Sequence, residues 1–239
     1  MRIITLIFLT INLCACSTTT KTSLSVKPYQ VDSGFITRPE PNTVSLTFDD
    51  GPSPYYTMKI LRILSRYHIH ATFFVTARYA RLHPKLLKKI LDQGSSLANH
   101  TFDHGNLTTL NEQQLRYEIL ESNQLIYRLT GIYPHCFRPP YLAINNQVRR
   151  YVLSHRFHII MGVSSDDYIQ TGPAALTERV LNRTRAGSII IMHDGYLGRS
   201  QTVAALPSII EGIAKKGLGF STLCKQLSDR DQPISMQSP

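Results

Sequence analysis

The chain has 239 residues, 42% of them hydrophobic, and no long low-complexity tract, so its composition excludes an intrinsically disordered protein and permits one substantial core. A formal net charge of +10 favours contact with an anionic surface, whether phospholipid headgroups, a cell-wall polymer or nucleic acid. Lysine and arginine are scattered along the sequence, with no aromatic-interleaved basic stripe and no zinc-finger spacing, which argues against nucleic acid as the partner.

The N-terminal segment Met1–Cys16 is predicted to be an export signal outside the fold. Its second residue is basic, and the apolar run over residues 3–13 is too short to span a bilayer stably. The segment ends in Leu-Cys-Ala-Cys, which resembles the lipobox of bacterial lipoproteins and implies a lipid anchor on Cys16. By the same resemblance Ser17 favours the outer membrane if the cell has two membranes, so we expect an envelope protein anchored there or on a periplasmic face. Because Cys14 is unusual two residues before the cut, a plain secretory signal and an uncleaved anchor remain alternatives.

The rest of the chain divides into a tether, one folded domain and a tail. Ser, Thr and Pro with little apolar periodicity predict a tether over residues 17–41, and residues 228–239 form a polar tail. The folded domain is expected over residues 42–227. Export permits a disulfide between Cys136 and Cys224, but the sequence does not fix their distance, and we favour two buried free thiols.

From Val44 onward, short apolar and β-branched runs alternate with amphipathic helical patterns, which is typical of βα units. The runs predict seven strands, at residues 44–48, 71–75, 96–98, 135–138, 158–163, 188–192 and 218–223. The patterns between them predict helices at residues 56–67, 84–93, 111–130, 145–153, 173–185 and 202–216. Seven strands are close to the number that closes a barrel, with an open sheet as the alternative.

Two of these helices carry specific end or breaker signals. The helix over residues 111–130 begins with a capping-box pattern, Asn111 and Gln114, and stops at Gly131. Pro207 falls inside the last predicted helix, so we expect that helix to kink or to start late.

The first strand ends in two adjacent carboxylates, Asp49 and Asp50, followed by a Gly-Pro turn. Side chains at the carboxyl end of a strand lie where α/β sheets and barrels hold ligands. Neighbouring like charges raise each other's cost of ionisation unless a cation is close, so the pair indicates a metal ion or a basic partner. The alternative is a plain Asp-Asp-Gly turn.

His100 and His104 are four residues apart, so on one helical turn both imidazoles project to the same side and can bind one ion. Together with Asp50 they form a set that suits catalytic zinc with one position left open. The same trio matches non-haem iron sites. The alternative is that one histidine caps a loop and the other is solvated.

Three further strand ends carry side chains suited to hydrolysis. Arg138 precedes a stiff Pro-Pro-Tyr turn and can pair with a carboxylate. Asp167 follows the apolar run at residues 159–163, and His193 ends the run at residues 189–192. Histidine is the side chain best matched to proton transfer near neutral pH. In a barrel all of these ends would gather at one rim.

The order of these segments, over about residues 44–223, resembles the polysaccharide deacetylases, the NodB-homology domain of carbohydrate esterase family 4. The resemblance implies an α/β fold, a distorted, incomplete (β/α) barrel of about seven strands in a single domain. It also implies a metal-dependent hydrolase that removes N-acetyl groups from a polysaccharide containing N-acetylglucosamine. Peptidoglycan is the first expected substrate because of the envelope address, with chitin-like polymers and poly-N-acetylglucosamine as further candidates. We expect a monomer that uses one divalent ion, zinc first.

The resemblance also assigns roles to residues of this sequence. The implied catalytic residues are Asp49 as base, Arg138 as the arginine that holds the base, His193 as acid and Asp167 as the partner of the acid. The implied metal ligands are Asp50, His100 and His104. The implied substrate-binding residues are Tyr141, Pro140, Tyr168 and Ile191. In the implied mechanism, Asp49 takes a proton from water and His193 protonates the departing amine.

Four positions depart from the family's pattern. Tyr168 stands in place of tryptophan and Ile191 in place of leucine, which implies a reshaped slot for the acetyl methyl group. Ser164 and Leu142 replace a common Asp and Gly. These changes bear on substrate choice, so an O-acetyl xylan esterase is the nearest enzymatic alternative. From another class, a non-catalytic glycan-binding lipoprotein remains an alternative.

Overall fold

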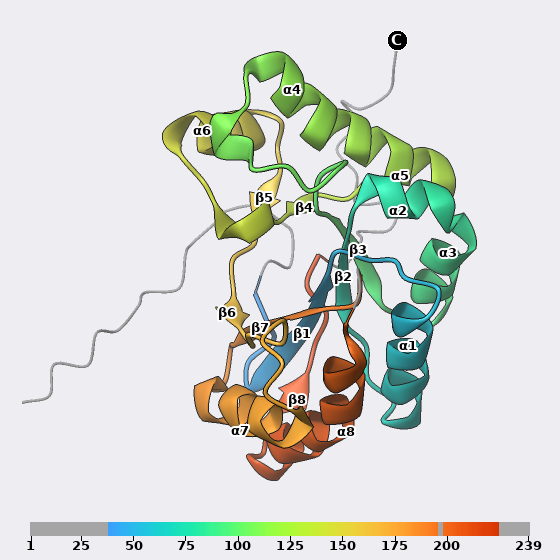
Figure 1. The fold of residues 1–239 in the computed structure, drawn as a ribbon, viewed down its shortest axis with the longest axis vertical. Coiled ribbons are helices and arrows are strands. Elements are labelled where there is room, and N and C mark those ends of the chain that lie inside the picture. Colours follow the sequence, from blue (N-terminus) through green and yellow to red (C-terminus); the bar gives the residue numbers. More distant parts are fainter. Residues whose placement is uncertain (1–37, 196–197, 225–239) are drawn as a thin grey trace, which may run out of the picture. The chain divides into compact units, whose positions relative to one another are not determined.

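In the described part of the chain, eight short parallel strands form one curled sheet (Figure 1). This computed structural model describes residues 38–195 and 198–224, so the predictions for the export signal, for Cys16 and for residues 228–239 fall outside the described residues. The strands are β1 Thr43–Asp49, β2 Thr72–Val75, β3 Ser96–Asn99, β4 Cys136–Phe137, β5 His158–Ile159, β6 Val163–Ser164, β7 Ile189–His193 and β8 Gly219–Phe220. They lie in the order β5-β4-β3-β2-β1-β7-β6, and β8 pairs with the start of β1. The predicted distorted, incomplete (β/α) barrel is confirmed.

The two edge strands, β5 and β6, are consecutive in the sequence, with only residues 160–162 between them (Figure 1). The prediction of one strand over residues 158–163 is therefore wrong, because its start pairs with β4 and its end with β7. Gly162 permits the change of partner: a Cβ there would lie 2.7 Å from the carbonyl oxygen of Ile189. The bridging segment, residues 160–162, thus crosses the gap in the barrel.

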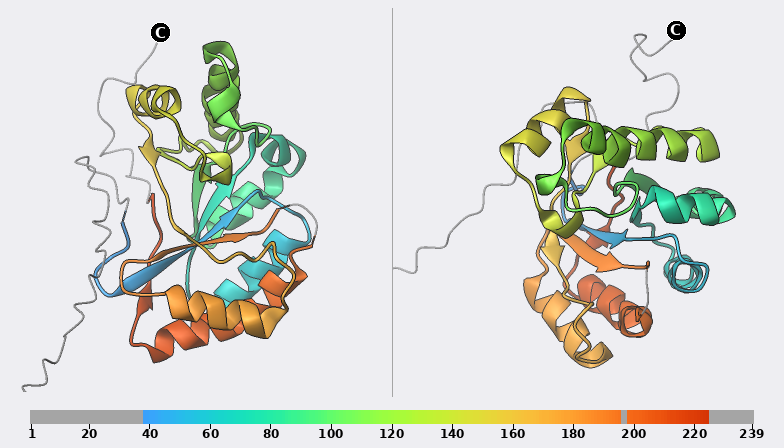
Figure 2. Two further views of the ribbon diagram at one scale, coloured as in Figure 1. Left: turned by 60° about the vertical axis from the view of Figure 1, so that its left-hand side comes forward. Right: turned by 45° about the horizontal axis from the view of Figure 1, so that its top comes forward.

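Helices cover the outer side of the sheet in each view (Figure 1 and Figure 2). Their bounds are α1 Tyr56–Arg66, α2 Ala77–Leu82, α3 Pro84–Asp92, α4 Glu112–Arg116, α5 Ser122–Thr130, α6 Asn146–Ser154, α7 Pro173–Arg183 and α8 Ser200–Lys215. Every predicted helix is present, and α2 was not predicted because six residues are too few to show a periodic pattern. Among the described residues, no helix combines the length and apolar character needed to cross a membrane.

The helix predicted over residues 111–130 is confirmed, with one interruption. Asn111 Oδ1 accepts from the backbone N–H of Gln114 at 3.0 Å, Gln114 Oε1 accepts from the N–H of Asn111 at 2.9 Å, and Gly131 ends α5 at a φ of 75°. Between α4 and α5, residues Tyr117–Glu121 form a π-helical segment that no sequence signal indicated. The last helix, α8, runs through Pro207 from a start at Ser200, so the expectation of a late start is wrong.

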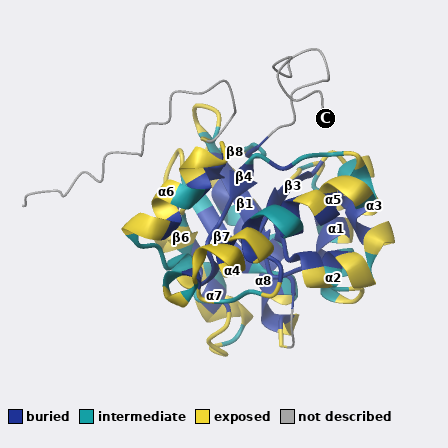
Figure 3. Cartoon of the chain, turned by 90° about the horizontal axis from the view of Figure 1, so that it is seen from above, coloured by how far each residue is buried: buried dark blue, intermediate teal, exposed yellow. Residues whose placement is uncertain are grey.

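Strand β1 separates the core beneath the helices from the barrel interior. Leu46 and Phe48 are buried in the main hydrophobic cluster with residues of α1 and α8. Thr47 and Asp49 alternate with them and contact the guanidinium of Arg138 in the interior. Figure 3 shows buried strands at the centre and exposed outer sides on the surrounding helices. The strand is therefore apolar toward the helices and polar toward the site.

A disulfide closes the described part of the chain at its C-terminal end. Cys136 on β4 is bonded to Cys224, with 5.8 Å between their Cα atoms. The expectation of two free thiols is therefore wrong. The pairing arises because the segment after β8 runs past the starts of β2 and β3, where the carbonyl oxygen of Leu223 accepts from Ser96 Oγ at 2.6 Å. Hydrogen bonds 127 residues apart in sequence leave no local signal.

Candidate active site

The two carboxylates at the end of β1 reach the same site because the backbone turns sharply between them. Asp49 is in register with His193 on β7, and Asp50 adopts a left-handed conformation with a φ of 74°. In an extended strand, successive side chains point to opposite faces, so this turn brings the second carboxylate back toward the first. A left-handed non-glycine residue costs about 1 kcal/mol, which the close packing around it must offset.

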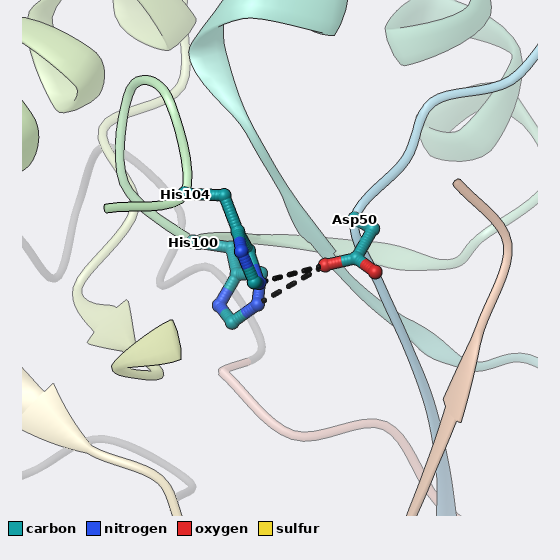
Figure 4. Close-up of side chains that lie close together, drawn as sticks. All are labelled: Asp50, His100 and His104. Carbon is teal, nitrogen blue, oxygen red and sulfur yellow. Dashed lines mark ion pairs between the residues drawn. The ribbon is translucent and has the colours of Figure 1, made fainter. Parts of the chain in front are cut away.

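Asp50, His100 and His104 form a candidate metal centre (Figure 4). Their ligand atoms lie within 4.8 Å of one another: Asp50 Oδ1 is 3.5 Å from His100 Nε2 and 3.1 Å from His104 Nε2. Asp50 Oδ1 is buried and accepts no hydrogen bond from the described residues. An orphaned buried acceptor facing two imidazole nitrogens fits a cation, because a buried polar atom is otherwise satisfied.

The protonation of both kinds of ligand suits a metal. His100 Nδ1 lies 2.8 Å from the carbonyl oxygen of Arg138, which can only accept, so Nδ1 carries a proton and Nε2, the nitrogen that faces Asp50, is the one that could bind an ion. Burial alone would raise the pKa of Asp50, but the imidazoles of His100 and His104 outweigh it and hold that pKa well below its usual range. Asp50 is therefore a carboxylate at any physiological pH.

Asp49 is held by a fully buried arginine. Arg138 Nη1 donates to Asp49 Oδ1 at 2.6 Å and to Thr47 Oγ1 at 2.9 Å, and its Nε donates to the carbonyl oxygen of Ile160 at 3.1 Å. The guanidinium also stacks on Phe74, 3.9 Å from the ring centre. Asp49 Oδ2 lies on the other side, 3.9 Å from His100 Nε2. One oxygen of Asp49 is thus engaged by the arginine, and the other faces the candidate metal centre.

His193 and Asp167 form the second charged pair. His193 Nδ1 is 2.6 Å from Asp167 Oδ1, while Asp167 Oδ2 accepts from the backbone N–H of His193 at 2.9 Å and from Thr202 Oγ1 at 2.7 Å. Burial alone would lower the pKa of His193, but the bond and charge of Asp167 outweigh it and raise that pKa. Burial alone would raise the pKa of Asp167, but the hydrogen bond and charge of His193 outweigh it and lower that pKa. His193 is thereby kept protonated to higher pH.

The predicted substrate-binding residues differ in exposure. Tyr141 is 70% exposed, has a left-handed φ of 59° and packs its ring edge-on against His104 at 4.8 Å. Tyr168 is 57% exposed and lies edge-on to the His193 ring at 6.2 Å. Pro140 and Ile191 are buried. The structure therefore presents two exposed tyrosines beside the site.

Comparison with known proteins decides the family. The family profile described as polysaccharide deacetylase matches residues 37–160, more than half of the chain. The chain belongs to the polysaccharide deacetylase family. A peptidoglycan-N-acetylglucosamine deacetylase of Bacillus cereus is 35% identical over 182 residues, which span 75% of this chain and 66% of that relative.

Solved structures of the family share the fold. The crystal structure of a peptidoglycan N-acetylglucosamine deacetylase in complex with 4-naphthalen-1-yl-N-oxidanyl-benzamide is 33% identical, with a TM-score of 0.75 over 78% of this chain and 89% of the other. A carbohydrate esterase family 4 pseudoenzyme from Bacillus anthracis is 26% identical, with a TM-score of 0.71 over 77% and 66%. The fold of a polysaccharide deacetylase therefore does not by itself establish turnover, and the site residues must carry that argument.

In this polysaccharide deacetylase two residues that brace Asp50 carry no signal in the sequence motifs. Arg199 Nη2 lies 3.4 Å from Asp50 Oδ2, and its Nε donates to the carbonyl oxygen of Gly195 at 3.0 Å. Asp194 is buried beneath the turn, where Thr57 Oγ1 donates to it, and a Cβ at Gly51 would collide with its carboxylate. Burial raises the pKa of Asp194 to about 7 against that hydrogen bond. No signal links Arg199 to a residue 149 positions earlier, whereas Asp194 directly follows the predicted acid His193 in the sequence.

A second missed group supports the loop between the two histidines. Glu118 lies in the π-helical segment, and its Oε2 accepts from the backbone N–H groups of Phe102 and Asp103 at 2.9 and 3.0 Å. Ser122 Oγ donates to the carbonyl oxygen of Thr101 at 2.9 Å. The π-helical segment thus places a carboxylate on the loop that carries both ligands, and such segments often occur at functional sites.

Proposed function

We propose that this chain is a metal-dependent polysaccharide N-deacetylase that releases acetate from N-acetylglucosamine units of peptidoglycan. One arrangement carries the proposal: Asp49, held by Arg138, and His193, held by Asp167, end neighbouring strands beside the candidate metal centre. Amide hydrolysis needs a base for the water, an acid for the departing amine and a cation for the developing negative charge. This site offers a group for each task.

Asp49 is the proposed general base. Arg138 occupies its Oδ1, so Oδ2, which faces His100, is the atom available to take a proton from water. The buried guanidinium fixes the orientation of this carboxylate, so the oxygen that faces the water has a defined geometry.

Zinc is the proposed metal, because two imidazoles and one carboxylate hold it with a position left open, although ferrous iron accepts the same ligands. When bound, such an ion supplies Lewis-acid stabilisation of negative charge on the acetamide oxygen. The chain's own contribution is to keep Asp50 ionised and to orient the His100 ring through Nδ1, so that Nε2 faces Asp50.

His193 is the proposed general acid. Its raised pKa keeps the imidazolium form that can protonate the departing amine, and Asp167 orients the ring through Nδ1. Tyr141 and Tyr168 are proposed to contact the sugar, since both are exposed beside the site, and the Tyr141 N–H is proposed to bind the oxyanion.

The proposal includes export and a lipid anchor on Cys16. The disulfide between Cys136 and Cys224 supports export, because disulfides persist in oxidising compartments and are rare in the cytosol. An envelope location in turn supports peptidoglycan as the substrate, as does the name of the Bacillus cereus relative.

The deciding experiment measures acetate release from peptidoglycan, chitin oligomers and O-acetylated xylan, with wild type and Asp49→Asn compared at equal metal content. We expect release from peptidoglycan and a loss of about 100- to 10,000-fold in the variant. Release from xylan alone would make the protein an ester hydrolase. Equal turnover in both proteins would remove Asp49 as the base, and no release from any substrate would favour a glycan-binding protein.

A further inference from the structure

The positive charge of this protein is concentrated in one part of the fold. Between Asp50 and Asp92 the sequence contains eight lysines and arginines and no carboxylate, so this segment supplies eight of the ten formal net charges. The eight cations are Lys59, Arg62, Arg66, Arg78, Arg81, Lys85, Lys88 and Lys89, and each lies on α1, α2 or α3. Eight of the 26 lysines and arginines therefore lie on three consecutive helices.

These cations share an outer surface because the apolar residues of the same helices face inward. Ile60 and Leu64 of α1 and Leu87 and Ile90 of α3 are buried in the main hydrophobic cluster. Seven of the eight cations are exposed, and only Lys59 is partly buried. Helix α3 contacts both α1 and α2, and the three helices lie side by side along β1, β2 and β3 (Figure 1 and Figure 2). We call the outer side of α1–α3 the basic flank.

The charge of the basic flank is not neutralised by ion pairs in the described part of the chain. No ion pair between described residues includes any of the eight cations. Lys59 bonds to the hydroxyl of Tyr55, and Arg81 lies over the ring of Phe102. Acids at its border include Asp92, which ends α3, Glu211 of α8, which accepts a hydrogen bond from Tyr67, and Asp103, which accepts one from Tyr117 beside the ring that Arg81 covers. Unpaired like charges repel one another and destabilise the folded state, so contact with an external anionic surface would reduce this repulsion.

We infer that the basic flank docks on an anionic phospholipid surface. A linear polymer is commonly held in a groove, whereas these cations are spread over the outward sides of three packed helices, which suits a plane of headgroups. Each lysine or arginine near such a surface strengthens binding by several-fold, and the effect weakens with added salt.

The length of the predicted tether fits this arrangement. Residues 17–37 separate Cys16 from the first described residue, and a chain of that length reaches at most about 70 Å when extended. The anchor would keep the folded domain close to the membrane, and at that high local concentration even weak contacts of the basic flank with headgroups would hold α1–α3 against the surface. The basic flank is also separate from the catalytic centre, since Asp50 and His193 lie at the carboxyl ends of strands and not on the outer sides of helices.

The test uses the full chain with Cys16→Ser, which removes the proposed lipid attachment, and vesicles of two kinds, phosphatidylcholine alone and phosphatidylcholine mixed with phosphatidylglycerol. Binding is followed by co-sedimentation at low and high salt. The flank variant is Lys85→Gln, Lys88→Gln, Lys89→Gln. The matched control removes the same charge from exposed positions elsewhere, Arg150→Gln, Arg156→Gln, Lys215→Gln. We expect salt-sensitive binding that prefers phosphatidylglycerol, falls about 10- to 100-fold in the flank variant and changes little in the control.

Four outcomes would overturn the inference. Equal losses in both variants would show that net charge alone matters, and no loss in the flank variant would exclude the flank. Equal binding of wild type to both vesicle kinds would exclude headgroup charge as the cause. If polyphosphate binding fell in the flank variant while vesicle binding did not, the partner would be a linear polyanion instead. Thermal melting and acetate release from soluble substrate, both expected to stay unchanged, show that each variant is folded.

Discussion

Arg138 Nη1 lies 2.6 Å from Asp49 Oδ1, and the arginine is entirely buried. Burial lowers the pKa of Arg138 against the opposing effect of Asp49, so each charge depends on the other for its place in the interior. The proposed base is therefore also one half of a structural pair, and changes to either residue should affect folding as well as turnover.

The first prediction concerns this pair. Arg138→Met should lower the free energy of unfolding by about 3–5 kcal/mol, because Asp49 would be left buried without its partner. The double variant Arg138→Met, Asp49→Asn should be less destabilised than the sum of the two single variants, since no unpaired charge remains. Urea denaturation measures all four corners of the cycle, and strictly additive effects would contradict the interpretation.

The second prediction separates binding of the metal from proton transfer. His104→Ala should lower metal content, because it removes one of three ligands, whereas His193→Ala should leave metal content unchanged and lower kcat by about 100- to 10,000-fold. Elemental analysis of the purified proteins gives the first quantity, and acetate release gives the second. Loss of metal from the His193 variant would contradict the prediction, because it would show that His193 also contributes to metal binding.

The third prediction is a shift in pH dependence. His193 must be protonated to act as an acid, so activity should fall as pH rises through its pKa, which Asp167 holds above the usual value for histidine. Asp167→Asn removes the charge that raises this pKa, so the basic limb of the kcat/KM profile should move to lower pH. NMR titration of His193 provides an independent check, and an unmoved basic limb would exclude the imidazole as its source.

The fourth prediction concerns a residue that sequence reasoning did not find. Arg199→Met should weaken metal binding by about 10- to 100-fold, because Asp50 Oδ2 loses the donor that holds Oδ1 toward the two histidines. Competition with a chelator measures the affinity. Arg183→Met is the matched control: Arg183 pairs with Asp166, at 2.7 Å, and not with a ligand. Equal weakening in both variants would make the effect one of net charge.

Much of the site could be predicted because its residues end strands. The apolar run of β1 placed Asp49 and Asp50 at a carboxyl end, and the spacing of His100 and His104 suggested a shared ion; the structure places these four side chains together. The bracing residues could not be predicted, because Arg199 contacts Asp50 through tertiary packing that leaves no periodic pattern.

The fold shows the same division between local and distant signals. Capping at Asn111 and Gly131 is encoded by neighbouring residues and was predicted, whereas the π-helical segment between α4 and α5 has no such code. The split of one predicted strand into β5 and β6 depends on the strand with which each half pairs. Gly162 is required there only because the backbone of Ile189 lies so close. The bond between Cys136 and Cys224 is the most distant case.

The bridging segment has a consequence for how the base can move. Arg138 Nε donates to the carbonyl oxygen of Ile160 in the bridging segment, and its Nη1 donates to Asp49 Oδ1. The guanidinium therefore links the bridging segment to Asp49 across the opening of the barrel. A movement of residues 160–162 would therefore shift Arg138 and, through it, the Asp49 carboxylate. Amide hydrogen exchange at residues 160–162 should then show how firmly the proposed base is held in place.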